Sequence, residues 1–333
     1  MVSRVLLLAA KDTIAYSTRP GREAVASGAE LLDTLPRDLL AAEVVVEDVL
    51  AEPSWDVTAA TMLGLGRRVR AAGTDDGYDG VVISYGTDTL AETAFLVDLM
   101  AGPAAPRAAI VLTGAVRHRD ELSADGPRNL ASAIAAAADP ALAGAGAVVC
   151  VDDELHAARW VSMVDATTVR AFSSAPYGVL GRVVGSRVEM LGTPPPRPPE
   201  ARGEPESDVA LIKTYPGIDP VLLTTVVDAG ARGVVLEGTG LGNIPVDLFV
   251  TIGDLTAADI PVVVASRCRT RPVGLSELPA PAGLAAKIGA IGARGLAPEK
   301  ARVALMVALG DDGGVAAARE WFDQLALPGS GGG

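Results

Sequence analysis

The stretch GVVISYGTDTLAETAFLVDLM, residues 80–100, contains the pattern that decides the fold. Residues 80–84 are an apolar run, residues 85–89 are small or polar, and apolar side chains recur near helical spacing in residues 90–100. This order predicts a buried strand, a loop and a helix, the repeating unit of a parallel α/β sheet. Further apolar runs at residues 3–10, 43–50, 110–114 and 147–151 predict more strands of the same sheet.

The turn after this strand carries two hydroxyls and a carboxylate in three residues, Thr87, Asp88 and Thr89. Ligands bind at the carboxyl ends of strands in open α/β sheets, and the free N–H groups of a following helix favour anions there. The turn is therefore a candidate binding site. The alternative is that Thr89 caps the helix in a capping box with Glu92. One turn can serve both purposes, and the spacing leaves both open.

Length and composition limit the classes of function. The 333 residues suit two domains, and a net charge of −13 argues against nucleic acid or an anionic membrane as a partner. The first apolar run is too short for a signal peptide and no run is long enough to span a membrane, so we expect a cytoplasmic protein. Cys150 and Cys268 lie in or beside apolar runs and are expected to be buried free thiols. Because no Cys, His or carboxylate cluster has metal-ligand spacing, no metal or other cofactor is expected.

The domain organisation follows from a change in composition. Residues 192–206, GTPPPRPPEARGEPE, are rich in proline and predict a semi-rigid linker. We expect an N-terminal α/β domain with the active site in residues 1–191, a smaller C-terminal α/β domain in residues 207–328, and a flexible tail in residues 329–333. The strands of the second domain are predicted at residues 209–213, 233–236 and 262–266.

Five segments carry a resemblance to a known family. The family is the bacterial-type asparaginase/glutaminase family, which these segments resemble in family order: GTDTLAET (86–93), TGAVR (113–117), SADGPRNL (123–130), YPGIDP (215–220) and GTGLGNIP (238–245). The resemblance implies a larger flavodoxin-like N-terminal domain with a parallel sheet and a smaller C-terminal α/β domain. It also implies a small-molecule substrate with an Asp- or Asn-like group, and a homodimer or homotetramer whose sites are completed across the interface.

The resemblance identifies Thr13 as the nucleophile and Thr87 as the second catalytic threonine. In the family, a glycine-rich turn precedes the nucleophile, whereas this chain has Lys11 and Asp12. Glycine there lets the backbone approach the substrate and supply N–H donors. The two charges are either solvated surface groups or a new catalytic acid and base. Tyr16, three residues after Thr13, is the only tyrosine in the segment that resembles the family's closing lid.

Substrate-binding positions are also implied by the resemblance. Ser54 matches the residue that holds the substrate's α-carboxylate, and Asp88 matches the residue that holds its α-ammonium group. From spacing alone, Ser54 could instead cap a helix predicted at residues 56–72. Further positions expected around the substrate are Tyr85, Trp55, Met163 and Asn243, the last of which reaches a neighbouring subunit's site in the family.

The largest departure from the family pattern is Met163, which stands where the family has the lysine of a Thr–Lys–Asp triad. A thioether neither takes up a proton nor carries a positive charge, so Thr87 loses its partner. His156 lies nearby in sequence and could take over the proton transfer.

Three functions therefore remain open. The first is a repurposed enzyme that acts on an Asp/Asn-like amide or carboxylate of a larger metabolite, with or without hydrolysis, and uses Lys11 and Asp12 as acid and base. The second is a slow L-asparagine amidohydrolase that uses Thr13, with Lys11 in place of the lost lysine. The third is a catalytically silent homologue that binds a ligand or partner. Loss of several catalytic positions, with Ser54 and Asp88 kept, favours the first.

Overall fold

A computed structural model describes residues 2–19, 25–36, 40, 42–201, 203–269, 273–279 and 283–325. The chain divides into two compact units, Met1–Pro195 and Pro196–Gly333, and each is described by itself. Residues 192–201 and 203–206, within the predicted linker, contain neither helix nor strand. The tail predicted at residues 329–333 lies outside the described residues.

The first unit is built on an eight-stranded sheet in the order β10-β9-β6-β5-β4-β3-β1-β2. Strands β1 to β5 pair in parallel, and β6, β9 and β10 extend the sheet in antiparallel fashion. Their bounds are Ser3–Ala10 (β1), Ala42–Leu50 (β2), Gly80–Ser84 (β3), Ala109–Thr113 (β4), Ala147–Val151 (β5), Glu154–Ala157 (β6), Gly181–Val184 (β9) and Arg187–Met190 (β10). The order 2-1-3-4-5 of the parallel strands is that of a flavodoxin-like sheet, as predicted.

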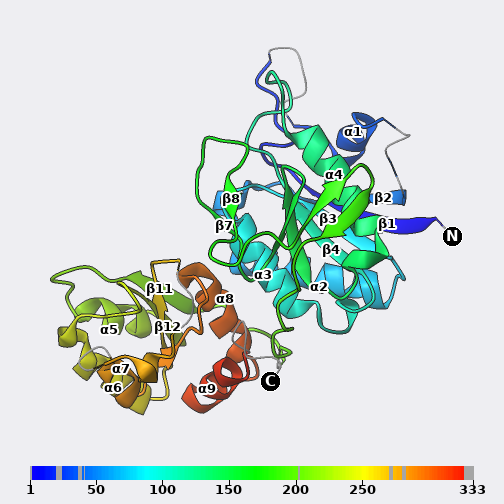
Figure 1. Cartoon of the computed structure of the whole chain (residues 1–333). Helices are drawn as coiled ribbons and strands as arrows, with labels where there is room; N and C mark the ends of the chain where they lie inside the picture. Colours follow the sequence, from blue (N-terminus) through cyan, green and yellow to red (C-terminus); the bar gives the residue numbers. More distant parts are fainter. Residues whose placement is uncertain are drawn as a thin grey trace. The chain divides into compact units, whose positions relative to one another are not determined.

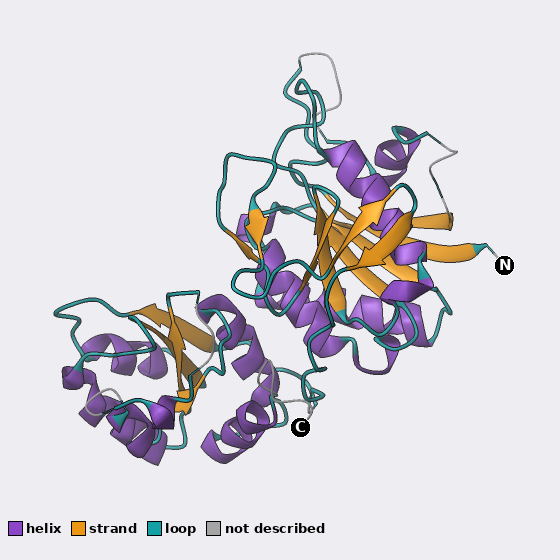
Figure 2. Cartoon of the chain, in the orientation of Figure 1, coloured by secondary structure: helices purple, strands orange, loops and turns teal. Residues whose placement is uncertain are grey.

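Helices cover both faces of this sheet, as the ribbons in Figures 1 and 2 show. One face carries α1 (Gly28–Asp33) and α4 (Gly126–Ala138), and the other carries α2 (Ala59–Thr74) and α3 (Leu90–Met100). Alternate residues of β1 enter the two cores: Val5 and Leu7 belong to the first, and Leu6 and Leu8 to the second. Because the central strands are buried on both faces, their sequences read as continuous apolar runs.

The local signals explain where the prediction differs from the structure. The helix expected at residues 56–72 begins at Ala59, where Thr58 accepts a hydrogen bond from Thr61 N, so the prediction that Ser54 caps this helix is wrong. Ser54 instead begins the short 3-10 helix η2, Ser54–Asp56. The strands β7 (Ser162–Met163) and β8 (Phe172–Ser173) form a separate antiparallel pair that the sequence did not predict, because two residues carry no periodicity.

The second unit contains a four-stranded parallel sheet in the order β11-β12-β13-β14. The strands are Val209–Lys213, Gly233–Gly238, Val262–Ser266 and Ile291–Gly292. The helices are α5 (Val221–Asp228), α6 (Phe249–Ala257), α7 (Leu284–Lys287), α8 (Pro298–Ala308) and α9 (Val315–Gln324). Apolar residues of α5 and α6 share a buried core with β12 and β13, and α8 contacts β11, β12 and β13. This smaller α/β unit is the architecture expected for the second half of the chain.

Each unit holds one of the two cysteines. Cys150 on β5 is fully buried, and burial raises the pKa of its thiol. Cys268, after β13, is exposed, so the expectation that both thiols are buried is wrong for Cys268. The apolar run before Cys268 ends at Ser266, the last residue of β13. A search of the described residues finds no helix that is both long and apolar enough to span a membrane.

Candidate active site

The candidate site lies where the strand order of the larger sheet reverses. Strand β1 has β2 on one side and β3 on the other, and Ala9 of β1 is in register with Ser84 of β3. In doubly wound sheets this reversal opens a crevice beyond the carboxyl ends of the strands. The main chain also joins the loop after β1 to the end of β2, because Lys11 N donates a hydrogen bond to Leu50 O (3.0 Å). The loops after β1, β2 and β3 therefore meet at one edge.

Asp12 is the central group of this edge. Its Oδ1 accepts hydrogen bonds from Thr13 N (2.6 Å) and from Thr13 Oγ1 (3.1 Å), and its Oδ2 accepts one from Ser54 N (2.7 Å). Only 4% of Asp12 is exposed, so the interpretation as a surface charge is wrong for this residue. Lys11 is half-buried. The structure thus joins the presumed nucleophile and the loop after β2 through one carboxylate.

Gly86 packs directly against this carboxylate. A Cβ at Gly86 would overlap both Asp12 Oδ2 and Ser54 Oγ, so only glycine fits at this position. In the sequence, Gly86 is recognisable only as part of a turn. A glycine just after a strand often marks a close approach of the backbone to another group, so its position could have predicted this contact.

Thr89 connects the turn after β3 to the loop after β2. Its Oγ1 donates a hydrogen bond to Ser54 O (2.8 Å) and lies 3.4 Å from the Tyr85 hydroxyl. Thr89 makes no side-chain capping bond to α3, so the capping-box interpretation is wrong. Tyr85 is 1% exposed; burial raises the pKa of its phenol, and the nearby negative charges of Glu92 and Asp12 act in the same direction.

The two remaining residues of the turn differ in exposure. Thr87 is buried, and its methyl group lies close to Gly114 at the end of β4. Asp88 is exposed at the rim. Thr87, the expected second catalytic residue, is therefore buried. Asp88, whose carboxylate is expected to hold an ammonium group, is exposed to solvent.

Three further residues are expected to bind the substrate, and none of them takes part in the contacts described above. Trp55 is 69% exposed on η2. Met163 is half-buried on β7, where it is paired with Phe172. Asn243 is exposed in the second unit, in a tight turn in which it exchanges backbone hydrogen bonds with Thr239. Their roles in substrate binding stay predictions.

His156 forms a buried group of its own. Its Nδ1 is 2.9 Å from Ser174 Oγ, and its Nε2 is 3.6 Å from a carboxylate oxygen of Glu154. His156 is 1% exposed and Ser174 is 2% exposed. These contacts hold β6 against the segment after β8, and they provide a structural reason for a buried histidine. A role for His156 in proton transfer to Thr87 stays a prediction.

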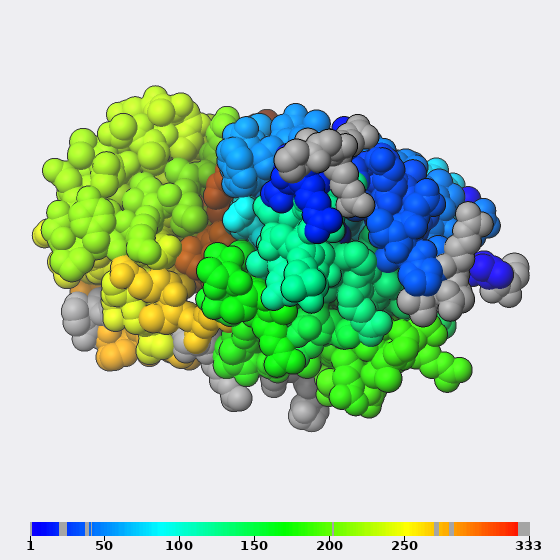
Figure 3. Space-filling model, turned by 90° about the horizontal axis from the view of Figure 1, so that it is seen from above, coloured from blue at the N-terminus to red at the C-terminus, as the bar shows by residue number. Residues whose placement is uncertain are grey.

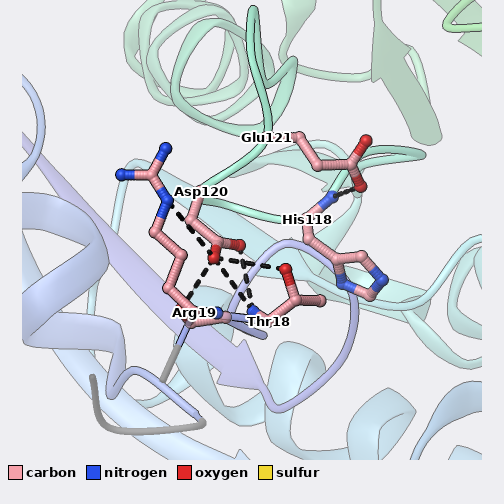
Figure 4. Close-up of polar contacts among 6 residues, drawn as sticks. Thr18, Arg19, His118, Asp120 and Glu121 are labelled. Atoms are coloured by element: carbon pink, nitrogen blue, oxygen red, sulfur yellow. Dashed lines mark hydrogen bonds and ion pairs between the residues drawn. The ribbon is translucent and has the colours of Figure 1, made fainter. Parts of the chain in front are cut away.

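The segment that follows Thr13 is anchored at its start. Tyr16 N donates to Asp12 O (3.1 Å), and Tyr16 O accepts from Arg119 N (3.1 Å). Figure 4 shows Thr18 and Arg19 converging on the Asp120 carboxylate, which accepts hydrogen bonds from Thr18 N (3.0 and 3.1 Å). In Figure 3 the dark-blue N-terminal atoms accordingly lie against the teal surface of residues 115–125. Residues 20–24 of the lid expected beyond Tyr16 lie outside the described part.

The pKa of Asp120 reflects this anchoring. Burial opposes ionisation of its carboxyl group, but hydrogen bonds from Thr18 N and Ser17 Oγ outweigh that effect and lower the pKa to about 2. The carboxylate is thus fully charged at neutral pH. Its hydrogen bonds fix Thr18, five residues after Thr13, against the loop that contains Asp120.

A pocket lies on the face of the larger sheet that α1 and α4 cover. It is lined by Ile14, Glu30, Leu31, Thr34, Arg119, Gly126, Pro127 and Leu130. None of the candidate catalytic residues lines it, and Ile14, next to Thr13, is its one lining residue from the loop that follows β1. It is therefore distinct from the edge that holds Asp12 and Ser54.

Comparison with known proteins places this architecture in a family. Residues 4–196 match the model of the asparaginase N-terminal domain, and residues 208–322 match that of the glutaminase/asparaginase C-terminal domain. A probable L-asparaginase of Deinococcus radiodurans is 36% identical over 264 residues, which cover 77% of this chain and 78% of the relative. One subunit of a glutamyl-tRNA(Gln) amidotransferase of Methanosphaera stadtmanae is 31% identical over 254 residues, covering 72% and 54% respectively.

A solved structure agrees with both domain matches. The probable cytoplasmic L-asparaginase of Campylobacter jejuni has a TM-score of 0.81 and 28% identity, and the match covers 97% of this chain and 99% of that one. The two family models match the two α/β units in the same order along the chain, and the structural match covers both units. With Thr13 and the GTDT turn meeting at the switch point of its larger sheet, the chain belongs to the asparaginase family.

Proposed function

We propose that the chain is an acyl-transfer enzyme that attacks the amide of an Asn-like group in a larger metabolite, with Thr13 as nucleophile and Asp12 as its base. One observation carries the proposal: Thr13 Oγ1 donates a hydrogen bond of 3.1 Å to Oδ1 of the buried Asp12. A threonine hydroxyl is a poor nucleophile until a neighbouring group removes its proton. Asp12 supplies that neighbour in a chain whose family lysine is replaced by Met163.

The reaction follows from this pair. As Thr13 Oγ1 attacks the amide carbon, its proton moves to Asp12 Oδ1. The tetrahedral intermediate then collapses and the C–N bond breaks as Lys11 gives a proton to the departing ammonia. The proton held by Asp12 then passes to Lys11, so that an ester on Thr13 remains and both groups are restored. Attack by water regenerates Thr13 and gives a carboxylic acid, and attack by an amine gives a new amide. General-base assistance of this kind contributes about 10²- to 10⁴-fold to the rate.

Lys11 and Thr87 complete the proposed machinery. Lys11 is half-buried and directly precedes Asp12, so its ammonium group is the proposed acid for the leaving group. Thr87 is buried in the turn after β3 and is the proposed donor that orients the attacking water. Slow hydrolysis of L-asparagine is the second candidate, because the relatives include proteins named L-asparaginase and the same Thr13 would serve it.

The test is ammonia release by the purified protein from a panel of primary amides that includes L-asparagine. We expect Thr13→Ala to abolish release and Asp12→Asn to lower it by about 10²- to 10⁴-fold, as loss of a general base does. The matched control is Thr74→Ala at the end of α2, which removes a threonine hydroxyl whose hydrogen bond among the described residues goes to Arg70 O; it should leave turnover unchanged. Equal turnover by the wild type and Thr13→Ala would refute the nucleophile. No release from any amide would favour a silent homologue.

We also propose that the chain acts in the cytoplasm as a homodimer or homotetramer. The support is that the similar solved structure from Campylobacter jejuni is named a probable cytoplasmic L-asparaginase, together with the expectation that Asn243 reaches a neighbouring subunit's site. Light scattering after size exclusion measures the assembly. A fully active monomer, or an Asn243→Ala variant with unchanged turnover, would contradict this part of the proposal.

A further inference from the structure

The edge at the switch point contains an anion-binding cradle that the chain fills with its own side chain. Backbone N–H groups of Thr13 and Ser54 converge on the two oxygens of Asp12, at 2.6 and 2.7 Å. Backbone N–H groups in such concave arrangements bind carboxylates and phosphates. Because Asp12 occupies both donors, a second carboxylate has no donor to bind there.

The packing around the cradle leaves no room for a second anion. Gly86 lies so close to Asp12 Oδ2 and Ser54 Oγ that even a methyl group would overlap them. Asp12 is 4% exposed and Ser54 is 1% exposed. The two N–H donors of the cradle are therefore filled by Asp12 and are not open to an added anion.

Within the described part of the chain, Asp12 has hydrogen bonds but forms no ion pair with a lysine or arginine. Glu92 lies near enough to Tyr85 to act on the same phenol as Asp12, so a second carboxylate is close to this edge. A buried charge without a counter-charge favours a ligand that supplies one.

A second observation points to a ligand at the same place. Ser54 Oγ is buried and has no hydrogen-bond partner among the residues that the structure describes. Like Asp12 Oδ2, it lies beside the position that a Cβ of Gly86 would take. Buried hydroxyls in native structures almost always have a partner, so an unpaired one at a candidate site is open to a bound group.

We infer that Asp12 acts as a built-in replacement for a substrate carboxylate, so that the site selects amide-bearing amines whose neighbouring carboxyl group is absent or amidated. This inference rests on the proposed function, because it assigns the substrate class of that same site. The ammonium group of the ligand supplies the positive charge that the described residues do not provide to Asp12. The simplest member of the class is 3-aminopropanamide, and L-asparaginamide is the member with an amidated carboxyl group.

The experiment is titration calorimetry of the full-length protein with 3-aminopropanamide, L-asparaginamide and L-asparagine. Because like charges placed together weaken binding strongly, we expect the wild type to bind both carboxyl-free probes at least about tenfold more tightly than L-asparagine. Asp12→Gly frees the N–H groups of Thr13 and Ser54 for the carboxylate of L-asparagine. This variant should therefore bind L-asparagine more tightly than the two carboxyl-free probes. Asp12→Asn keeps the shape, removes the charge, and lowers the preference by about tenfold or more. The matched control Asp56→Asn removes an exposed charge on η2 and leaves the order unchanged.

The outcomes separate this inference from the proposed function. The inference is overturned if the wild type binds L-asparagine as tightly as 3-aminopropanamide, if it binds none of the probes, or if neither Asp12 variant changes the order. Ammonia release from L-asparagine as fast as from the carboxyl-free amides also overturns it, while leaving the proposed function intact. The expected binding order without ammonia release from any probe supports the substrate class and removes the proposed reaction.

Discussion

Gly86→Ala is the sharpest test of the cradle, because a single methyl group would overlap Asp12 Oδ2 and Ser54 Oγ. Overpacking of a dense interior costs about 1–3 kcal/mol. If Asp12 is displaced instead, three hydrogen bonds to a charged group weaken, each contributing about 1.5–3 kcal/mol, although hydration of the released carboxylate offsets much of that loss. We therefore expect the free energy of unfolding to fall by about 2–4 kcal/mol, near the upper end for single substitutions.

Urea unfolding followed by circular dichroism measures this change, and Gly64→Ala is the control. Gly64 lies in α2 with no atom within 4 Å of the position of a new Cβ. The same substitution there should stabilise the protein by about 0.5–1 kcal/mol, because glycine inside a helix is unfavourable. The two variants should thus shift the unfolding midpoint in opposite directions. A Gly86→Ala protein as stable as the wild type, with unchanged ammonia release, would refute the closeness of Gly86 and Asp12.

Three further predictions concern the surroundings of the cradle. Met163→Lys should raise ammonia release from the best amide by about tenfold or more, because it restores a group that exchanges protons, whereas the uncharged Met163→Gln should not; equal rates for the two variants would contradict this. Thr89→Val should lower the free energy of unfolding by about 1 kcal/mol in urea titrations, because Ser54 O loses its donor at 2.8 Å; an unchanged midpoint would contradict it. Asp120 has a pKa of about 2, below its ordinary 3.8, so its anchoring of Thr18 is complete above that ordinary value and is lost as the pH falls through about 2. The Thr18 amide resonance should therefore titrate with a midpoint near pH 2 and should not titrate in Asp120→Asn, whereas a midpoint near 4 would show that the carboxylate is not held.

Much of the fold was predictable because the central strands are distinct in sequence. Residues 3–10, 80–84 and 147–151 coincide with β1, β3 and β5, since strands buried on both faces are continuous apolar runs. The five family-like segments then supplied the two-domain architecture, which the family models and the structural match confirm. Helix starts were less predictable, because α2 is capped by Thr58, one of several hydroxyl residues near its start.

The site was predictable in its members but not in its contacts. Lys11 and Asp12 stood out as replacements of glycines, yet nothing in the sequence shows that Asp12 reaches Ser54 N, 42 residues away. Thr89 was interpreted as a helix cap because Thr and Glu at that spacing form capping boxes in general. Its hydroxyl instead bonds Ser54 O, a contact that exists only after β2 and β3 have taken their places on either side of β1. Contacts of this kind depend on strand order, which local periodicity does not contain.

The placement of the two cysteines has a practical consequence. Cys268 in the second unit is exposed, whereas Cys150 lies inside the central sheet of the first, with its thiol held in the unreactive protonated form. An alkylating reagent should therefore modify the native protein in two well-separated kinetic phases. The slow phase reports how often the first sheet opens, without a signal from the second unit. The opening rate of the fold that supports Asp12 can thus be measured by mass spectrometry on the unaltered chain, without any engineered label.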